Sequence, residues 1–458
     1  MGLFKHDGMI KGLERNYSSF NFCDGIAKLH RSNYPDLLVY FFYLLFLADR
    51  KQIMLKSNST YLFKFAFLLL LSCTLALPVS AQSRLETLVG NGGILLHSPN
   101  GEVLASINPE RELVPASLVK IPLAQVALTA LGESFRFETH FYQNSSGDLM
   151  IRGLGDPFLV SEEVAKITEI LAQRGIQQIH RLVMDDSAFE PEPRLPQEQG
   201  TDPYAARNSA LAVNFNTVNL GWTTSGTLTS AEPQTPLTEV ARKLGAQLSP
   251  GEPQRINLGD DPLVGLKQAQ QLFNHFLVSS GIIITDTNFY RESLTDEWSL
   301  FYKHRSSRSL QGNLNGMLRY SNNFIANQLF LTLGAQEKSY PTNIDMARVI
   351  LQQQLNELYG NNFGIDPQLL LMTEGSGLSR GQRTTASGLM HVLKVFEPYA
   401  DFLPEVNGVL RKSGTLTGVY NFAGYIAGSD GLYPFVILTN QASNNRAEIL
   451  QSLKRLVD

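Results

Sequence analysis

Cysteine is nearly absent from this chain. Among 458 residues only Cys23 and Cys73 are cysteines, and both lie near the N-terminus. If the segment before residue 82 is removed, as we expect below, the mature protein has no thiol and forms no disulfide. The eight histidines are scattered without a metal-binding spacing such as H-E-x-x-H. We therefore expect neither a metal site nor another cofactor.

An excess of charge of one sign is also missing. The chain carries 38 Lys and Arg against 42 Asp and Glu, which gives a formal net charge of -4. The absence of a polybasic run argues against a nucleic-acid-binding surface. The composition, 43% hydrophobic and 17% charged, is typical of a globular chain long enough for two or more domains.

Long hydrophobic runs are scarce as well. The apolar run Phe65–Leu77 is shorter than the about 20 residues that a helix needs to cross a membrane, so we expect no stable transmembrane anchor. Lys56 and Lys64 precede it, and Val79-Ser80-Ala81 supplies small residues for cleavage. Residues 54–81 are therefore predicted to be a signal peptide, and the mature protein is predicted to be exported to the periplasm.

Residues 1–53 do not fit this organisation, because a signal peptide does not normally carry a long segment ahead of its charged region. We hypothesise that the true start is Met54 and that 1–53 is not part of the true protein. A lipoprotein is the less favoured alternative, because a lipidated Cys73 would be followed by an apolar tail.

The two ends of the mature chain carry patterns that can share one sheet. Apolar runs at 94–97 and 103–107 flank Asn100-Gly101, a strong hairpin signal. A second hairpin is predicted at 418–427 and 432–439, followed by a helix with an apolar stripe. We expect a discontinuous domain of residues 82–136 and 301–458.

The middle third has a different texture and is predicted to be an inserted α+β domain, residues 137–300. Short apolar runs predict strands, and longer amphipathic stretches predict helices. The strands are expected at 137–143, 149–152, 181–184 and 218–222, and a helix at 262–279.

Ser117 and Lys120 are the most informative pair in the sequence. In a helix, residues three apart lie on one face within reach of each other. A serine hydroxyl needs a base to become a nucleophile, and a desolvated lysine can serve as that base. We predict that Ser117 is the nucleophile and Lys120 its base.

Ser321-Asn322-Asn323 forms a second element, at a point where a helical pattern over 310–333 breaks. A hydroxyl at Ser321 can relay a proton to a leaving amine. The amide of Asn323 can hold both Lys120 and the substrate backbone.

Lys412-Ser413-Gly414-Thr415 forms a third element, in or beside a predicted strand. Lys412 adds positive potential near a substrate carboxylate, and Ser413 and Thr415 can hydrogen-bond that carboxylate. Gly414 lets a substrate backbone approach the strand. The backbone N–H groups of Thr415 and Ser117 are candidates for an oxyanion hole.

Each element alone has an ordinary structural explanation: a helix start, a helix cap, and a turn before a strand. S-x-N runs also occur at Ser19, Ser98 and Ser443, but only Ser321 lies between the other two elements. The order S-x-x-K, S-x-N and K-[ST]-G favours a serine–lysine acyl-transfer site, because β-lactamases and penicillin-binding proteins carry this set.

The chain resembles the low-molecular-mass class C penicillin-binding proteins, which are D-alanyl-D-alanine carboxypeptidases and endopeptidases. Further motifs carry this resemblance, especially to the branch with a large insert after the S-x-x-K helix. They are Gly153-Leu154-Gly155-Asp156-Pro157, Val213-Asn214-Phe215-Asn216, Glu374-Gly375-Ser376-Gly377-Leu378-Ser379-Arg380 and the segment 416–424. The resemblance covers essentially all of residues 85–458.

The resemblance implies an α+β fold: a β-lactamase/transpeptidase-like domain, with an antiparallel sheet flanked by helices, and an inserted α+β domain. It implies peptidoglycan stem peptides ending in D-Ala-D-Ala as substrates and acylation of Ser117, also by β-lactams. A β-lactamase or esterase of the same superfamily and an inactive peptidoglycan-binding homologue are the alternatives.

The chain departs from the family pattern at several positions. Ser413 stands where Thr is usual, Glu374 where Asp is usual, and Gln382 where Asn is common. The insert between Lys120 and Ser321 is short for this branch, so a nested subdomain is expected to be missing. The last three departures concern the fit of substrates, while the hydroxyl kept at Ser413 predicts that activity is retained.

Overall fold

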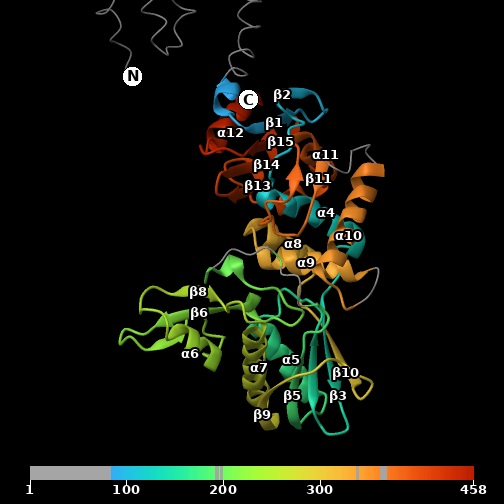
Figure 1. Cartoon of the computed structure of the whole chain (residues 1–458), viewed down its shortest axis with the longest axis vertical. Coiled ribbons are helices and arrows are strands. Elements are labelled where there is room, and N and C mark those ends of the chain that lie inside the picture. Colours follow the sequence, from blue (N-terminus) through green and yellow to red (C-terminus); the bar gives the residue numbers. More distant parts are fainter. Residues whose placement is uncertain (1–83, 191–194, 196–199, 337–339, 362–368, 458) are drawn as a thin grey trace, which may run out of the picture. The chain divides into compact units, whose positions relative to one another are not determined.

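The computed structural model describes residues 84–190, 195, 200–336, 340–361 and 369–457. The predicted signal peptide and the predicted start at Met54 lie outside these residues. Two five-stranded sheets organise the described chain (Figure 1). The first contains strands from both ends of the chain, and the second contains strands from its middle.

The first sheet has the order β13-β14-β15-β1-β2, with β13 at one edge. Its neighbouring strands are all antiparallel. The strands are β1 (Gly92–His97), β2 (Val103–Ile107), β13 (Val409–Leu416), β14 (Val419–Gly428) and β15 (Gly431–Thr439). Both predicted hairpins are present, β1 with β2 and β14 with β15.

Alternate side chains of this sheet enter two different cores, as the two-residue period of a strand requires. Leu95 faces a large core built with helices on one side, whereas Ile94 and Leu96 face a smaller core on the other side. That smaller core is closed by α12 (Arg446–Lys454) through Ile449 and Leu453. The sheet is therefore buried on both faces, and its strands are correspondingly apolar.

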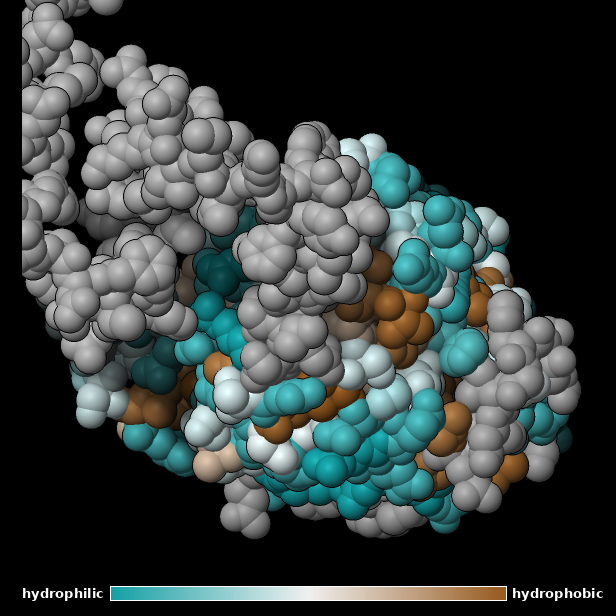
Figure 2. All heavy atoms as spheres, turned by 90° about the horizontal axis from the view of Figure 1, so that it is seen from above, coloured by the Kyte–Doolittle hydropathy of each residue, from teal (hydrophilic) through white to brown (hydrophobic). Residues whose placement is uncertain are grey.

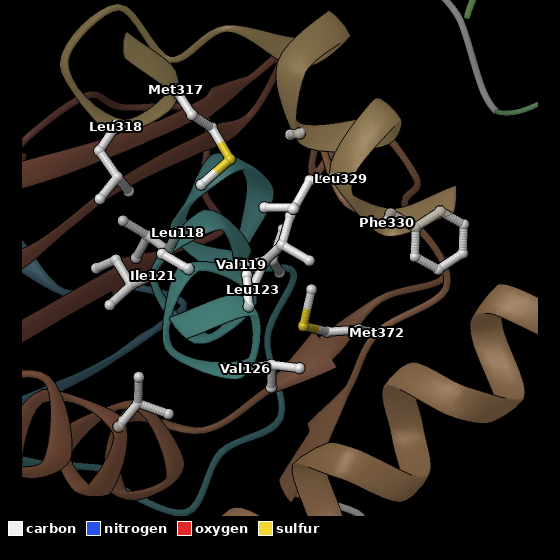
Figure 3. Close-up of a cluster of buried hydrophobic side chains, with 14 of the residues drawn as sticks. Leu118, Val119, Ile121, Leu123, Val126, Met317, Leu318, Leu329, Phe330 and Met372 are labelled. Atoms are coloured by element: carbon white, nitrogen blue, oxygen red, sulfur yellow. The ribbon is translucent and has the colours of Figure 1, made fainter. Parts of the chain in front are cut away.

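Helices on the larger-core side carry the first two motifs. They are α4 (Lys120–Leu131), α8 (Leu310–Arg319), α9 (Asn323–Gln336), α10 (Ile344–Leu355) and α11 (Ala386–Phe396). Figure 3 shows Leu118, in the turn before α4, and Ile121, Leu123 and Val126 of α4 packing beside Met317 and Leu318 of α8, Leu329 and Phe330 of α9, and Met372. The short strands β11 (Leu370–Leu371) and β12 (Arg383–Thr384) pair beside this core.

The second sheet has the order β10-β3-β4-β5-β9. Its strands are β3 (Glu138–Gln143), β4 (Leu149–Gly153), β5 (Gln178–Asp185), β9 (Ile283–Arg291) and β10 (Ser299–Arg305). β4, β5 and β9 are parallel, and α5 (Ser161–Gln173) and α7 (Pro262–Ser279) lie in their connections. Both helices bury apolar side chains in the core of this sheet. Because β10 extends to Arg305, the second sheet continues past residue 300.

A small three-stranded sheet, β7-β6-β8, completes the middle of the chain. It consists of β6 (Thr217–Trp222), β7 (Leu228–Ser230) and β8 (Gln254–Asn257), and α6 (Glu239–Gly245) packs on it.

The predicted α+β fold, with an antiparallel sheet flanked by helices and a further α+β portion, is confirmed. The face in Figure 2 shows hydrophobic residues in separate groups among polar ones. Across the described residues, every helix is too short or too polar to span a bilayer.

Candidate active site

Ser117 lies in a single turn of 3-10 helix, Ala116–Val119, which leads directly into α4 at Lys120. Pro122 lies in the first turn of α4, where a missing backbone N–H leaves no helical hydrogen bond unmade. The pair faces the same way, and the Lys120 Nζ lies 3.0 Å from the Ser117 Oγ. The one-turn spacing therefore brings hydroxyl and amine into contact, as predicted.

Lys120 is fully buried and contacts three oxygen atoms. Besides the Ser117 hydroxyl, it donates to the Asn323 Oδ1 at 2.9 Å and to the backbone carbonyl of Ser376. Burial lowers the pKa of Lys120 well below its usual value, and the nearby charge of Lys412 lowers it further, against a smaller opposing effect of Glu374. The site thus favours the neutral amine.

Asn323 begins α9, directly after the break that the sequence predicted. At this break Ser321 has a left-handed backbone with φ of 53°, and Asn322 caps the new helix by accepting from the Ile325 N–H at 2.9 Å. The Asn323 Nδ2 donates to the backbone carbonyl of Tyr204 at 3.3 Å. Because its amide nitrogen is engaged there, the Asn323 oxygen faces Lys120.

Lys412 reaches the second motif from β13. Its Nζ donates to the Ser321 Oγ at 2.7 Å and to the Ser413 carbonyl at 2.7 Å. Burial lowers the pKa of Lys412 to about 7, and the positive charge of Arg446 contributes. The five residues predicted for catalysis thus lie together. Hydrogen bonds link Ser117, Lys120 and Asn323 in one group and Lys412 and Ser321 in another, and Asn322 alone separates Ser321 from Asn323 in the chain.

Gly414 lies against the segment that carries Ser117. A Cβ at this position would lie 2.6 Å from the Pro115 carbonyl oxygen and 3.2 Å from the Leu118 Cγ. The glycine is therefore required by contact within the protein itself, a reason different from the approach of a substrate backbone that the sequence suggested. A role of Gly414 in substrate binding stays a prediction.

Ser413 and Thr415 occupy the opposite side of β13 from Lys412 and Gly414, because side chains alternate along a strand. Thr415 is exposed, and its Oγ1 accepts a hydrogen bond from the Arg446 Nη1 at 2.7 Å. The predicted binding of a carboxylate by Ser413 and Thr415 stays a prediction.

The loop after β11 contains a functional group that the sequence did not reveal, the carbonyl of Ser376. This oxygen accepts from Lys120 and also from the Ser117 hydroxyl, the latter at 3.2 Å. The resemblance had marked the loop as a motif. A backbone carbonyl has no side-chain signature, so its contact with the lysine is visible only in the structure.

Glu374 organises this loop from inside. Its buried carboxylate accepts from the backbone N–H groups of Ser376 at 2.6 Å, Gly377 at 2.8 Å and Ser379 at 3.2 Å. The Gln382 side-chain amide donates to the same carboxylate. Two departures from the family pattern, Glu374 and Gln382, are thus direct partners within one network.

Comparisons with known proteins identify the family of this chain. A family model described as D-Ala-D-Ala carboxypeptidase 3 (S13) matches residues 80–244 and 265–404. A D-alanyl-D-alanine carboxypeptidase of Actinomadura sp. is 26% identical over 76% of this chain and 77% of its own length. The D-alanyl-D-alanine carboxypeptidase DacB of Haemophilus influenzae is 23% identical over 82% of this chain and 91% of its own length.

Solved structures show the same fold. Penicillin-binding protein 4 (dacB) of Haemophilus influenzae superposes with a TM-score of 0.65 at 20% identity, covering 82% of this chain and 98% of that chain. Its complex with a novel β-lactam gives a TM-score of 0.60 at 21% identity, over the same shares. With the family model matched over most of its length, this chain belongs to the D-Ala-D-Ala carboxypeptidase 3 (S13) family of serine peptidases.

Proposed function

We propose that this protein hydrolyses D-alanyl-D-alanine bonds in peptidoglycan stem peptides, through an acyl-enzyme on Ser117, and that β-lactams acylate the same hydroxyl. The family assignment, the names of the relatives and the β-lactam complex of penicillin-binding protein 4 support the substrate class. The geometry of Lys120 is the observation that carries the mechanism.

The partners of Lys120 determine where its lone pair points when the amine is neutral. The Asn323 Oδ1 and the Ser376 carbonyl oxygen can only accept, so they take the two N–H groups of the amine. The remaining direction leads to the Ser117 Oγ at 3.0 Å, the one partner that carries a proton. In the structure this proton is directed at the Ser376 carbonyl, 3.2 Å away, so the hydroxyl must rotate towards Lys120 before the transfer. A neutral Lys120 is therefore oriented to remove the proton of Ser117.

The reaction then follows in two balanced steps. The Ser117 Oγ forms a bond to the penultimate D-Ala carbonyl carbon, and its proton passes to Lys120. As the C–N bond breaks, the proton taken up by Lys120 passes through Ser321, whose oxygen is held by Lys412 at 2.7 Å, to the departing D-Ala amine, and Lys120 is neutral again. Water then attacks the ester carbonyl carbon and gives a proton to Lys120. As the ester C–O bond breaks, this proton passes to the Ser117 Oγ, and the shortened peptide leaves as a carboxylic acid.

The edge position of β13 suits this substrate. An edge strand offers unpaired backbone groups to an extended peptide. The peptide would place its scissile carbonyl between the backbone N–H groups of Ser117 and Thr415, the proposed oxyanion hole, worth about 2.7–4 kcal/mol per donor. Its terminal carboxylate would lie at Ser413 and Thr415.

We propose the domain organisation that the sequence predicted, with residues 82–136 and 301–458 as the catalytic domain and 137–300 as the insert, except that the insert extends to Arg305, where β10 of the second sheet ends. The first sheet, shared by both ends of the chain, supports the first assignment. Export to the periplasm, where peptidoglycan is found, follows from the signal-peptide pattern at 54–81.

Labelling with a fluorescent penicillin tests the proposal. The wild-type protein is expected to take one label, and mass spectrometry should place it on Ser117. The Ser117→Ala variant, which removes one half-buried hydroxyl and leaves the core intact, is expected to take none. An unlabelled wild-type protein, or equal labelling of Ser117→Ala, contradicts the assignment.

Two assays separate this function from its alternatives. Rapid multiple turnover of nitrocefin would identify a β-lactamase, whereas slow release after a single turnover supports a peptidase. Mass spectrometry of peptidoglycan fragments then distinguishes loss of a terminal D-Ala, the carboxypeptidase reaction, from cleavage of a cross-link. No change in either fragment class, despite labelling, would indicate an inactive homologue.

A further inference from the structure

Arg411 and Arg446 form a cationic pair beside the third motif. Both guanidinium groups lie over the ring of Phe422, at 4.4 and 4.6 Å from its centroid. They come from different elements, since Arg411 precedes Lys412 on β13 and Arg446 begins α12. Two like charges therefore contact one aromatic ring, and Arg446 also acts electrostatically on a third cation, Lys412.

No acidic side chain of the described chain lies within ion-pair distance of this pair. Both arginines are half-buried, so water screens their repulsion only in part. Arg446 also stands at the first position of α12, where the positive end of the helix dipole disfavours a cation. The folded protein thus maintains a concentration of positive charge that no described acidic residue neutralises.

The contact of Arg446 with Thr415 determines how the Thr415 hydroxyl is oriented. A guanidinium has donors only, so the Thr415 Oγ1 must be the acceptor in the 2.7 Å hydrogen bond. The single proton of the Thr415 hydroxyl then points away from Arg446. Thr415 is exposed, and it is therefore held ready to donate to an acceptor arriving from solvent.

We propose that Arg446 is a positioning residue that makes the site selective for ligands with a free carboxylate. It orients the Thr415 hydroxyl as a donor and adds long-range attraction for an anion. The inference rests on the proposed function, because the carboxylate is that of the terminal D-Ala or of the β-lactam nucleus. If the hydrogen bond between Arg446 and Thr415 only stabilised the packing of α12 on β13, the site would show no such selectivity.

Acylation by benzylpenicillin and by its neutral methyl ester tests the proposal. The quantity of interest is the ratio of the two acylation rate constants, acid over ester. Arg446→Met is expected to lower this ratio about tenfold, because the Thr415 hydroxyl is no longer oriented as a donor and the nearby positive charge is lost. Arg446→Lys keeps the charge and should restore part of the ratio. Arg411→Met, which removes the neighbouring charge without touching Thr415, should change the ratio less than Arg446→Met.

Thr415→Val provides the second arm and keeps the proposal testable if Arg446→Met does not fold. It is expected to lower the ratio, and adding Arg446→Met to it should lower the ratio little further, because the two residues act as a unit. An unchanged ratio in folded Arg446→Met or in Thr415→Val overturns the proposal. Wild-type protein that is not acylated on Ser117 by benzylpenicillin would instead refute the proposed function.

Discussion

The backbone carbonyl of Tyr204 accepts a hydrogen bond from the side-chain amide of Asn323. This contact joins a segment of the inserted region to the second motif, and neighbouring bonds reinforce it. Asn208 donates to the Phe324 carbonyl at 2.9 Å and to the Gln328 Oε1 at 3.1 Å. The insert therefore takes part in orienting a group that contacts the proposed base.

Weakening this junction is expected to slow acylation. Gln328 is fully buried and also donates to the Ser209 carbonyl at 2.9 Å, so Gln328→Ala leaves partners unpaired on both sides. We expect a several-fold lower acylation rate constant for a fluorescent penicillin, measured by stopped flow. Gln353→Ala, at an exposed helix position with only a local hydrogen bond to Glu357, is the matched control. Equal rates for wild type and Gln328→Ala would contradict the coupling.

Replacing Asn323 itself should have a larger effect. In Asn323→Ala the Lys120 amine loses an acceptor, and its lone pair is no longer restricted to the direction of Ser117. Positioned proton transfer contributes about 10²–10⁴-fold, so a loss of at least tenfold in acylation rate is expected. Asn323→Asp provides a comparison, because a carboxylate keeps an acceptor but favours the charged lysine. Its acylation should also be slow, and a fast Asn323→Asp would argue against a neutral base.

Lys412 predicts a stability that depends on pH. Its pKa is about 7 in the folded protein and near 10.5 when unfolded, so between these values the unfolded chain binds more protons. Stability from this group therefore rises as pH increases from about 7 to 10.5. The Lys412→Met variant lacks this contribution. Its melting temperature relative to wild type should fall across that range, as followed by thermal unfolding at several pH values, and a constant difference would contradict the shift.

Gly377 is predicted to tolerate no side chain. Its φ is 91°, and a Cβ would lie 2.6 Å from the Ser117 backbone nitrogen. Gly377→Ala should displace the nucleophile and reduce labelling by fluorescent penicillin by at least tenfold. Gly381→Ala, where a Cβ would meet only the Ser379 hydroxyl at 3.4 Å, is the control in the same loop. Full labelling of Gly377→Ala would show that the segment can move without loss.

Glu374 and Gln382 predict a coupled pair. Removing the carboxylate in Glu374→Ala leaves several buried N–H groups without an acceptor and is expected to destabilise the protein by about 3 kcal/mol or more.

The common family residues can be restored together in the double variant Glu374→Asp with Gln382→Asn. This variant should lose less unfolding free energy than the two single changes added together, because the two side chains contact each other. Urea unfolding of Glu374→Asp, Gln382→Asn and the double variant measures the coupling. If the two single losses in unfolding free energy add up to the loss in the double variant, the two residues are not coupled.

Much of the fold was accessible from the sequence because its signals are local. The hairpin around Asn100-Gly101 and the helix break at Ser321 were both predicted and are both present. β9 and β10 were not predicted. Most of their side chains are exposed or only half-buried at the sheet edges, so neither strand carries the apolar alternation that marks a half-buried strand.

The candidate site divides in the same way. Ser117, Lys120 and Lys412 have reactive or charged side chains, and they were predicted from their motifs. The Ser376 and Tyr204 carbonyls contribute only backbone atoms, which every residue possesses. The contact of Gly414 with the Pro115 carbonyl also could not be predicted, because Pro115 is distant in sequence and is brought near only by folding.

In the first sheet β15 lies between β1 and β14. The N-terminal strands β1 and β2 can therefore pair with β13 and β14 in one sheet only after β15, the last strand in the sequence, has been made. Lys412, which contacts Ser321, lies on β13, and β13 is joined to β1 only through β14 and β15. During synthesis the nucleophile emerges from the ribosome long before the strand that completes its surroundings. A nascent or truncated chain ending before residue 431 therefore carries Ser117 and Lys120 but lacks the sheet that holds them in register, and it should remain inert towards acylating agents until synthesis ends.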